Sequence, residues 1–348
     1  MKCLIKCALS LLLAAILLTA CGNAPASSAD TPSAGETTPT TAEPTAKELT
    51  PVGNMLRHMS FNILGTDGLP RIDDPEKSAN IKAIIQQIDP DTFGVEETAQ
   101  VWTDGLVELL EGKYAVVGGH SDPKVERTAN WMNALYYKVD KFDCLDSGAW
   151  YLSGDDDGKY VSGQPGNTCS FALLERKEDG ALILLLNMHL QWLPLGSEDL
   201  EAHNFQYYGI ATSDSNISRD NQVVRAAQLG QAYSEKYAVQ YGKPVATLIG
   251  GDYNIDALKD ALYDHEYTRM SENMARFGFT ESAFSARELI TNQSTENWVT
   301  YRRSASRLDY IFVSETVLSQ TFTVGKIDVD YTISSDHLPV YLDYYIGQ

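Results

Sequence analysis

Positive charge is scarce in this chain of 348 residues. Lysine and arginine together number 27 against 47 aspartates and glutamates, so the formal net charge is −20. Loss of residues 1–20 would remove Lys2 and Lys6 and no acid, which lowers the charge from −20 to −22. Such a charge argues against strong non-specific binding to nucleic acid or to an anionic membrane surface. It does not exclude a nuclease, because a divalent cation reverses the local field.

Cysteine is also scarce, with five in the chain. Beyond Cys21, the sequence contains Cys144 and Cys169, and neither lies in a Cys-X-X-Cys motif or a histidine-rich stretch. This argues against a thiolate metal site. In an oxidising compartment the two cysteines either pair or stay as separately buried thiols, and the sequence leaves both open.

The N-terminal apolar run is too short to cross a membrane. It covers residues 8–18, broken only by Ser10, and follows two lysines, which is typical of an export signal. It ends at Leu18-Thr19-Ala20-Cys21. We therefore expect residues 1–20 to be a lipoprotein signal peptide and Cys21 to be acylated, with the protein on the extracytoplasmic face of a bacterial cell membrane. Ordinary cleavage beside an incidental cysteine is the alternative.

Large apolar side chains are nearly absent from residues 22–51, which consist almost entirely of Ala, Ser, Thr, Pro, Gly and Glu. Such a segment cannot bury enough surface to offset its ordering entropy, so we predict a disordered tether over residues 21–51. Residues 52–348 show no second linker and no internal repeat, and we predict one domain there.

Hydrophobic periodicity in this domain predicts helices and strands that alternate in two blocks. We expect helices over residues 73–88, 99–110, 220–241, 255–263 and 267–276. We expect strands over residues 55–64, 92–95, 114–117, 133–138, 142–152, 169–176, 181–190, 244–249, 298–301, 308–313, 321–328 and 338–344. Two mixed β-sheets packed face to face, with helices on their outer faces, accommodate this order, so we predict an α/β sandwich.

Acids, amides and imidazoles stand where these strands end or begin. They are Asn62, Glu97, His189, Asp252, Asn254, Asp309, Asp336 and His337. Because polar groups at strand edges line the ligand crevice of α/β sheets, we expect all of them to meet at one rim. Each alone has an ordinary explanation, such as a turn, a helix N-terminus or a core histidine. Their joint occurrence favours a site.

The chemistry of a phosphoester explains why these residue types would gather. Glu97, Asp336 and the amide of Asn62 are hard oxygen ligands suited to Mg²⁺, with Mn²⁺ or Ca²⁺ as alternatives. A bound cation neutralises charge that develops on phosphoryl oxygens. Asp309, hydrogen-bonded to His337, would set the tautomer of the imidazole and prepare it for proton transfer near neutral pH.

Two further residues complete the predicted chemistry. Asp252 would orient or deprotonate the attacking water, and Asn254 would donate to the phosphate or orient Asp252. The combination predicts a metal-dependent phosphoester hydrolase.

Six short segments carry a resemblance to a known family, the endonuclease/exonuclease/phosphatase superfamily, which includes deoxyribonucleases and neutral sphingomyelinases. They are Met59-Ser60-Phe61-Asn62, Gly94-Val95-Glu96-Glu97, Asn187-Met188-His189-Leu190, Gly251-Asp252-Tyr253-Asn254, Leu308-Asp309-Tyr310-Ile311-Phe312 and Ser335-Asp336-His337-Leu338-Pro339-Val340. They come in the family's order and span residues 55–345. The Gly-Asp-X-Asn and Ser-Asp-His segments are the most specific.

The resemblance implies a four-layer α/β sandwich and a role for each residue. Asn62, Glu97 and Asp336 would be metal ligands. Asp252 and Asn254 would position water and phosphate, Asp309 would support His337, and His189 would contact the phosphate.

The chain departs from the family pattern at two positions. Trp131 stands where many members have a glutamate, and Gln191 stands where many have an aspartate. These changes motivate an alternative hypothesis, a family member that binds without cleaving. A second alternative is a solute-binding lipoprotein, in which the aromatic residues of segment 192–208 stack on a ligand or pack on themselves.

The substrate stays open at this stage. A lipid head group, a small phosphodiester and nucleic acid all fit a membrane-tethered hydrolase, which we expect to be a monomer. Arg302, Arg303 and Arg307 form the one notable basic cluster, near Asp309 in sequence. They either hold a substrate phosphate or form a solvated turn.

Overall fold

The computed structural model describes residues 49–65, 72, 74–118, 133–155, 159, 167–192, 219–292, 294, 298–325 and 334–348. All of these lie in one unit, Glu48–Gln348. The predicted signal peptide, Cys21 and nearly all of the predicted tether lie outside the described residues. Among the described residues, no helix is both long enough and apolar enough to span a membrane.

Two mixed sheets form the centre of this unit. The first has seven strands in the order β10-β12-β13-β1-β2-β4-β3, and the second has six in the order β5-β6-β7-β8-β11-β9. The first sheet contains β1 (Pro51–Asn62), β2 (Thr92–Glu96), β3 (Tyr114–Gly118), β4 (Ala134–Lys138), β10 (Glu288–Ile290), β12 (Val317–Val324) and β13 (Val340–Gly347). The second contains β5 (Phe142–Tyr151), β6 (Thr168–Arg176), β7 (Leu182–His189), β8 (Val245–Asp252), β9 (Phe279–Glu281) and β11 (Asp309–Ser314).

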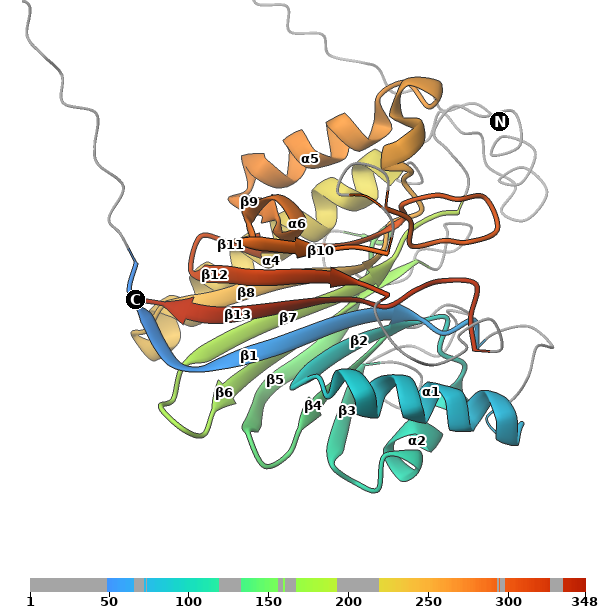
Figure 1. Cartoon of the computed structure of the whole chain (residues 1–348). Coiled ribbons are helices and arrows are strands. Elements are labelled where there is room, and N and C mark those ends of the chain that lie inside the picture. The colour runs from blue at the N-terminus through green and yellow to red at the C-terminus, as the bar shows by residue number, and fades with distance from the viewer. Residues whose placement is uncertain are drawn as a thin grey trace, which may run out of the picture. The chain divides into compact units, whose positions relative to one another are not determined.

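Helices cover the outer face of each sheet. On the first sheet lie α1 (Pro75–Ile88) and α2 (Gln100–Leu109), whose apolar side chains share a core with those of β1 and β2. On the second sheet lie α4 (Arg219–Tyr241) and α5 (Glu266–Arg276), beside the shorter η3 (Ala257–Leu262) and α6 (Ser282–Ser285). Figure 1 shows these layers, and they confirm the predicted four-layer sandwich.

The sequence explains how the layers form. In α1 the Asp74 side chain accepts from the backbone N–H groups of Glu76 (3.0 Å) and Lys77 (3.1 Å), which caps the helix. Pro75 occupies the first turn, where its missing N–H costs nothing. The isoleucines of α1 then recur at helical spacing and are buried against the sheet.

Strand β7 is buried on both faces, as its continuous apolar run predicts. Leu182, Leu184 and Leu186 pack toward α4 and α5, whereas Ile183 and Leu185 pack between the two sheets. The alternation of side chains along a strand therefore supplies two cores from one segment.

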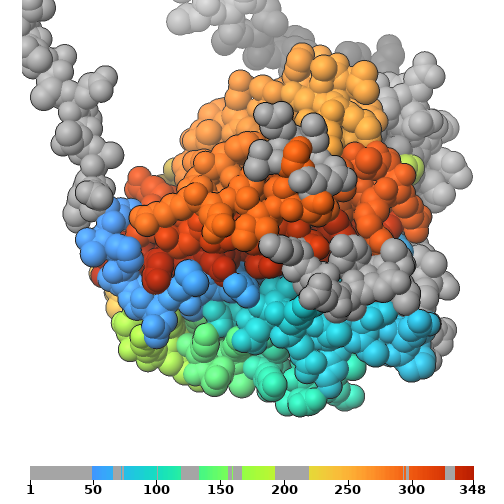
Figure 2. Space-filling model, viewed as in Figure 1, coloured from blue at the N-terminus to red at the C-terminus, as the bar shows by residue number. Residues whose placement is uncertain are grey.

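The first and last strands of the unit lie side by side. Strand β1 pairs antiparallel with β13 from Pro51↔Gly347 to Ser60↔Val340. The backbone of Thr50 both donates to and accepts from Gln348, each at 3.1 Å. Figure 2 shows these strands, blue and red, between the two helical layers.

One predicted strand, residues 298–301, is wrong. Tyr301 forms only isolated bridges, to Ser306 and to His337, because residues 301–306 fold back in a tight turn with Ala305 at a φ of 49°. Trp298 instead packs its ring on Phe322. Strand β12 ends at Val324, and the rest of the predicted strand 321–328 beyond Gly325 lies outside the described residues.

The two described cysteines, Cys144 and Cys169, are not bonded to each other. Cys144 lies opposite Leu174 in the β5–β6 ladder, whereas Cys169 lies opposite Trp150. Five residues of strand separate Leu174 from Cys169, or about 17 Å at the usual rise per residue, so no disulfide joins the pair.

Candidate functional site

Strand ends from both sheets converge on one rim. Strands β1 and β2 run parallel with Asn62 opposite Glu96, and β7 and β8 run parallel with His189 opposite Asp252. Strand β11 runs antiparallel to β8 and begins with Asp309 opposite Asp252. The structure therefore brings Asn62, His189, Asp252 and Asp309 together at a shared rim.

Asp252 lies at the centre of the cluster and is 1% exposed. Its Oδ2 accepts from the amide of Asn62 at 3.0 Å, and its Oδ1 accepts from the backbone N–H of Asn254 at 2.9 Å. The Nε2 atoms of His189 and His337 both lie 3.5 Å from Oδ2. One carboxylate thus links strands of both sheets to two imidazoles.

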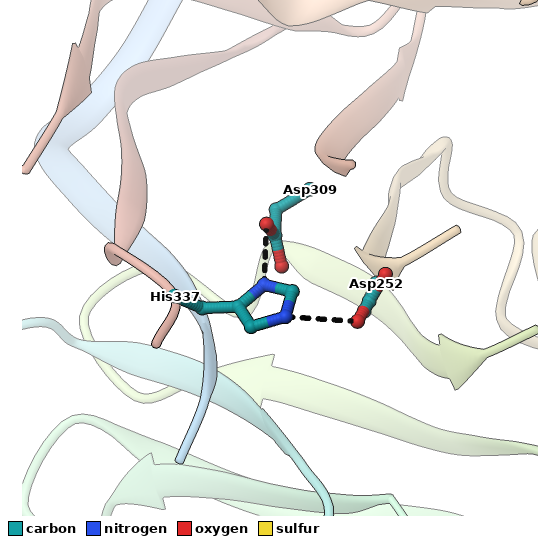
Figure 3. A group of neighbouring side chains, drawn as sticks. All are labelled: Asp252, Asp309 and His337. Carbon is teal, nitrogen blue, oxygen red and sulfur yellow. Dashed lines mark hydrogen bonds and ion pairs between the residues drawn. The ribbon is translucent and has the colours of Figure 1, made fainter. Parts of the chain in front are cut away.

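Asp309 and His337 form a buried pair (Figure 3). The Oδ2 of Asp309 lies 2.9 Å from Nδ1 of His337, which leaves Nε2 directed at Asp252. Burial by itself disfavours the imidazolium, but the charges of Asp309 and Asp252 outweigh it and raise the pKa of His337 to about 10. Burial, reinforced by Asp252, also raises the pKa of Asp309.

Backbone contacts hold this pair in place. The hydroxyl of Thr300 accepts from the N–H groups of Leu308 (2.9 Å) and Asp309 (3.1 Å). The hydroxyl of Ser335 donates to the carbonyl of Asn62 at 2.6 Å and accepts from the N–H of His337 at 3.0 Å. The Ser-Asp-His segment is therefore tied to the end of β1.

Asn62 links two carboxylates at the rim. Its amide nitrogen donates to Glu97 Oε1 at 3.1 Å as well as to Asp252, while its oxygen accepts from the N–H of Leu64 at 3.0 Å. Glu97 has a φ of 55°, in the left-handed region that non-glycine residues rarely adopt. This turn directly after β2 sends Glu97 to the rim, while Glu96 before it is fully buried. Strain of this kind is typical of functional sites.

Asp336 precedes His337 in the chain, and its two carboxylate oxygens have different surroundings. Its Oδ2 lies 2.9 Å from Nε of Arg303. Its Oδ1 is buried and has no hydrogen-bond partner among the described residues, as is also true of Oδ1 of Asp309. A buried carboxylate oxygen without a donor is costly unless a cation or water meets it.

These oxygens fit a divalent cation. Glu97, Asp336 and Asn62 form the predicted ligand set, and rotation of the Asn62 amide by half a turn would present its oxygen. A second group, Asp252, Asp309 and His337, has ligand atoms within 4.8 Å of one another. Asp309 is already committed to Nδ1 of His337, so Glu97, Asp336 and Asn62 are residues that could hold a metal while the second group could transfer protons. The hard oxygen donors suit Mg²⁺ or a similar ion.

His189 and Asn254 lie on the other side of Asp252. The amide of Asn254 donates to Nε2 of His189 at 2.9 Å and to the carbonyl of Leu190 at 3.1 Å. Asn254 has a φ of 52°, and Gly251 before it has a φ of 145°. A Cβ on Gly251 would lie 1.9 Å from the carbonyl oxygen of Met188, so this close strand approach requires glycine.

Sequence reasoning missed two buried ionisable groups near the rim, Lys77 and Glu96. Lys77 donates to the carbonyl of Leu64 at 2.7 Å and lies over the ring of Trp102. Burial lowers its pKa to about 8 against the opposing charges of Glu97 and Asp336. Lys77 lies four residues before Ile81 on the buried face of α1, and this spacing is the sequence signal from which its burial could be predicted.

Glu96 is the second missed group. It is fully buried, and burial, with Asp309 and Asp252 nearby, raises its pKa well above the ordinary value, which favours the protonated acid. Its alternation with Gly94 along β2 predicts an inward side chain, but no local pattern shows that the inner face is polar there.

Arg303 and Arg307 of the predicted basic cluster lie in different environments. Arg307 is buried, with its guanidinium over the rings of Trp298, Tyr267 and Tyr310, which excludes it from substrate contact. Arg303 has a largely exposed side chain beside Asp336 and is the member placed at the rim.

Of the two positions that depart from the family pattern, the structure describes only Gln191. Trp131 and most of the aromatic segment 192–208 lie outside the described residues. Gln191 is buried, and its backbone N–H donates to the side chain of Gln222 at 3.0 Å. Gln191 therefore belongs to the packing between β7 and α4.

Comparisons with known proteins agree with this geometry. A family model described as the endonuclease/exonuclease/phosphatase family matches residues 59–337. The comparison with curated proteins found no match.

Similar solved structures include two proteins from Bacteroides thetaiotaomicron. One, an endonuclease/exonuclease/phosphatase family protein, is 19% identical, with a TM-score of 0.60 over 85% of this chain and 99% of that chain. The other, a mannosyl-6-phosphatase, is 20% identical, with a TM-score of 0.60 over 84% and 100%. Truncated TDP2 from Caenorhabditis elegans is 16% identical, with a TM-score of 0.52 over 84% and 98%. At these identities the likenesses show the fold.

Proposed function

Because this chain belongs to the endonuclease/exonuclease/phosphatase family, we propose that it is a divalent-metal-dependent hydrolase of phosphoesters. The observation that carries the proposal is the arrangement of Asp252, Asp309 and His337, whose ligand atoms all lie within 4.8 Å of one another. Asn62 joins this group directly to Glu97, the nearest predicted metal ligand.

Each group of site residues has a separate role in the proposed hydrolysis. A cation held by Glu97, Asp336 and Asn62 would neutralise charge that develops on the phosphoryl oxygens. Asp252, whose carboxylate lies at the centre of the rim, orients the attacking water and accepts its proton. His337, held by Asp309 through Nδ1 and with Nε2 3.5 Å from Asp252, would donate a hydrogen bond from Nε2 to a phosphoryl oxygen bound beside Asp252.

We propose that His189 and Asn254 contact the phosphate. They hydrogen-bond each other beside Asp252, so a phosphoryl oxygen would take the place of His189 as an acceptor for the Asn254 amide. Arg303 stands at the opposite edge beside Asp336 and adds a cation to an otherwise acidic rim.

The partner classes that we propose follow from the predicted location. With residues 1–20 removed and Cys21 acylated, the hydrolase would be tethered as a monomer to the extracytoplasmic face of the membrane. Its substrates would be small phosphoesters, lipid head groups or nucleic acid encountered there. The net charge of −20 favours small substrates over long polyanions.

A metal-supplemented substrate screen tests the proposal. Residues 48–348 would be assayed with Mg²⁺, Mn²⁺ and Ca²⁺ against phosphosugars, phosphodiesters, phosphoinositides, sphingomyelin, DNA and RNA. We expect turnover that chelator abolishes, and a fall of about 1000-fold or more in kcat for Asp252→Asn and for His337→Gln. Arg269→Lys, at an ion pair with Asp220 that contacts none of the proposed catalytic or metal-binding residues, is the control.

Two outcomes would contradict the proposal. One is turnover that survives both substitutions. The other is tight metal binding by a protein that hydrolyses none of these compounds, which would favour the member that binds without cleaving.

A further inference from the structure

A buried arginine, Arg219, bonds the backbone of segments that carry rim residues. Arg219, at the start of α4, is 1% exposed, and its Nε lies 2.7 Å from Oε1 of Glu266 at the start of α5. Its Nη2 also bonds the second carboxylate oxygen of Glu266, which makes the pair bidentate. Such a pair keeps the guanidinium in one orientation.

The remaining face of this guanidinium bonds backbone at the site. Its Nη1 donates to the carbonyl of Asn254, and it lies 3.4 Å from the carbonyl of Gln191 and 3.5 Å from that of Trp192. These carbonyls belong to the segments that follow β8 and β7. One side chain therefore joins the two strand ends that carry Asp252 and His189.

Gln222, one turn along α4, holds the same region. Its side-chain oxygen accepts from Gln191 N–H at 3.0 Å, and its amide donates to Asn167 at 3.3 Å. Asn167 in turn donates to the carbonyl of His189 at 2.9 Å. The first turn of α4 therefore fixes the backbone from His189 to Gln191.

We infer that Arg219 is a positioning residue for the reaction, and this inference rests on the proposed function. Asn254 adopts a left-handed backbone conformation that an asparagine does not favour strongly by itself. The bond from Arg219 to its carbonyl holds that conformation, and the conformation aims the Asn254 amide at His189. Glu266 keeps the guanidinium buried and oriented, so the ion pair acts on the site through Asn254.

A pair of substitutions separates this role from simple stability. Arg219→Met alone would leave Glu266 buried without its partner, so the test variant is the double change Arg219→Met with Glu266→Leu, which leaves no orphan charge. Because a small misplacement of a catalytic group is costly, we expect kcat to fall about 10- to 100-fold, with KM and the metal requirement within about twofold.

Two variants serve as comparisons. Glu266→Gln keeps the bond from Arg219 to Asn254 but weakens the hold on the guanidinium, so kcat should fall less than in the double variant. Arg269→Met removes an ion pair to Asp220 that also joins α5 to α4, at 3.0 Å, but does not touch Asn254. It should leave kcat unchanged. Equal kcat in the double variant and the wild type would overturn the inference, as would an equal loss in Glu266→Gln and the double variant.

A crystal structure of the double variant gives a result that does not depend on turnover. We expect Asn254 to leave the left-handed region or its amide to turn away from His189. An unchanged Asn254 would overturn the positioning role even if no substrate is found. A displaced Asn254 in a protein whose wild type hydrolyses nothing would instead refute the proposed function alone.

Discussion

At the scale of single residues, His337 is held by one carboxylate and aimed at another. Asp309→Asn keeps the size of the side chain but removes the charge that fixes the imidazole tautomer. We expect kcat on the best substrate to fall about 100-fold or more with little change in KM. Steady-state kinetics measures this. Asp343→Asn, which removes a carboxylate paired with Arg57 at 2.6 Å, is the control and should keep its kcat.

His58 is a buried residue whose charge state affects stability. It is fully buried, Nδ1 lies 2.9 Å from Thr92 Oγ1, and burial lowers its pKa to about 3. The folded protein therefore keeps His58 neutral while the unfolded chain takes up a proton below about pH 6.5. This contribution to stability is present above pH 6.5 and is lost as the pH falls toward 3, at about 1.4 kcal/mol per pH unit.

Urea unfolding at two pH values tests the effect. Between pH 6.5 and pH 5, the wild type should lose about 2 kcal/mol more than His58→Asn, because the variant lacks the titrating group. The difference between the two proteins cancels the other titrating groups that they share. Parallel losses in both proteins would show that His58 does not titrate in this way.

At the scale of elements, the approach of β8 to β7 depends on one glycine. Gly251→Ala would place a Cβ 1.9 Å from the carbonyl oxygen of Met188, so the strands must separate next to Asp252 and His189. We expect a loss of about 3 kcal/mol or more in unfolding free energy, together with loss of activity.

Gly278→Ala provides the matched control. Gly278 also has a positive φ, of 83°, but nothing lies within 4 Å of a Cβ added there. This substitution should cost about 1 kcal/mol from backbone strain alone and should leave activity intact. Similar losses in the two variants, measured by chemical denaturation, would mean that the contact with Met188 does not matter.

Most elements were predictable because their signals are local. The isoleucines of α1 and the apolar run of β7 define their own structure, and a polar residue that follows such a strand must lie at its end. The strand predicted over residues 298–301 failed because tertiary contacts decide that segment: Thr300 bonds Leu308 and Asp309, and Tyr301 bridges to His337. The β propensity of these residues is outweighed by those contacts.

The supporting residues of the site were not predictable for a related reason. Glu96 and Arg219 act through neighbours that are distant in sequence, Glu96 beside Asp309 and Arg219 against Asn254 and Glu266. A single sequence shows their residue types but not these contacts. The burial of Lys77 was predictable from the sequence, because Lys77 shares the helical spacing of the α1 isoleucines.

At the scale of the whole molecule, the rim concentrates negative charge in a protein of net charge −20. A cation that binds the folded state should therefore raise its stability, by about 2.7 kcal/mol at a concentration one hundred times its Kd. We expect Mg²⁺ to raise the melting temperature of the wild type. The double variant Glu97→Gln with Asp336→Asn should show no such rise, and an equal rise would place the cation elsewhere.

The pairing of β1 with β13 sets the distance between the chain ends and the rim. Thr50 and Gln348 bond each other, whereas Asn62 at the rim is eleven residues further along β1 than Pro51, about 36 Å at the strand rise. A label or surface linkage attached at Gln348 would therefore lie at the end of the sheet away from Asn62 and would leave substrate access to the rim unobstructed.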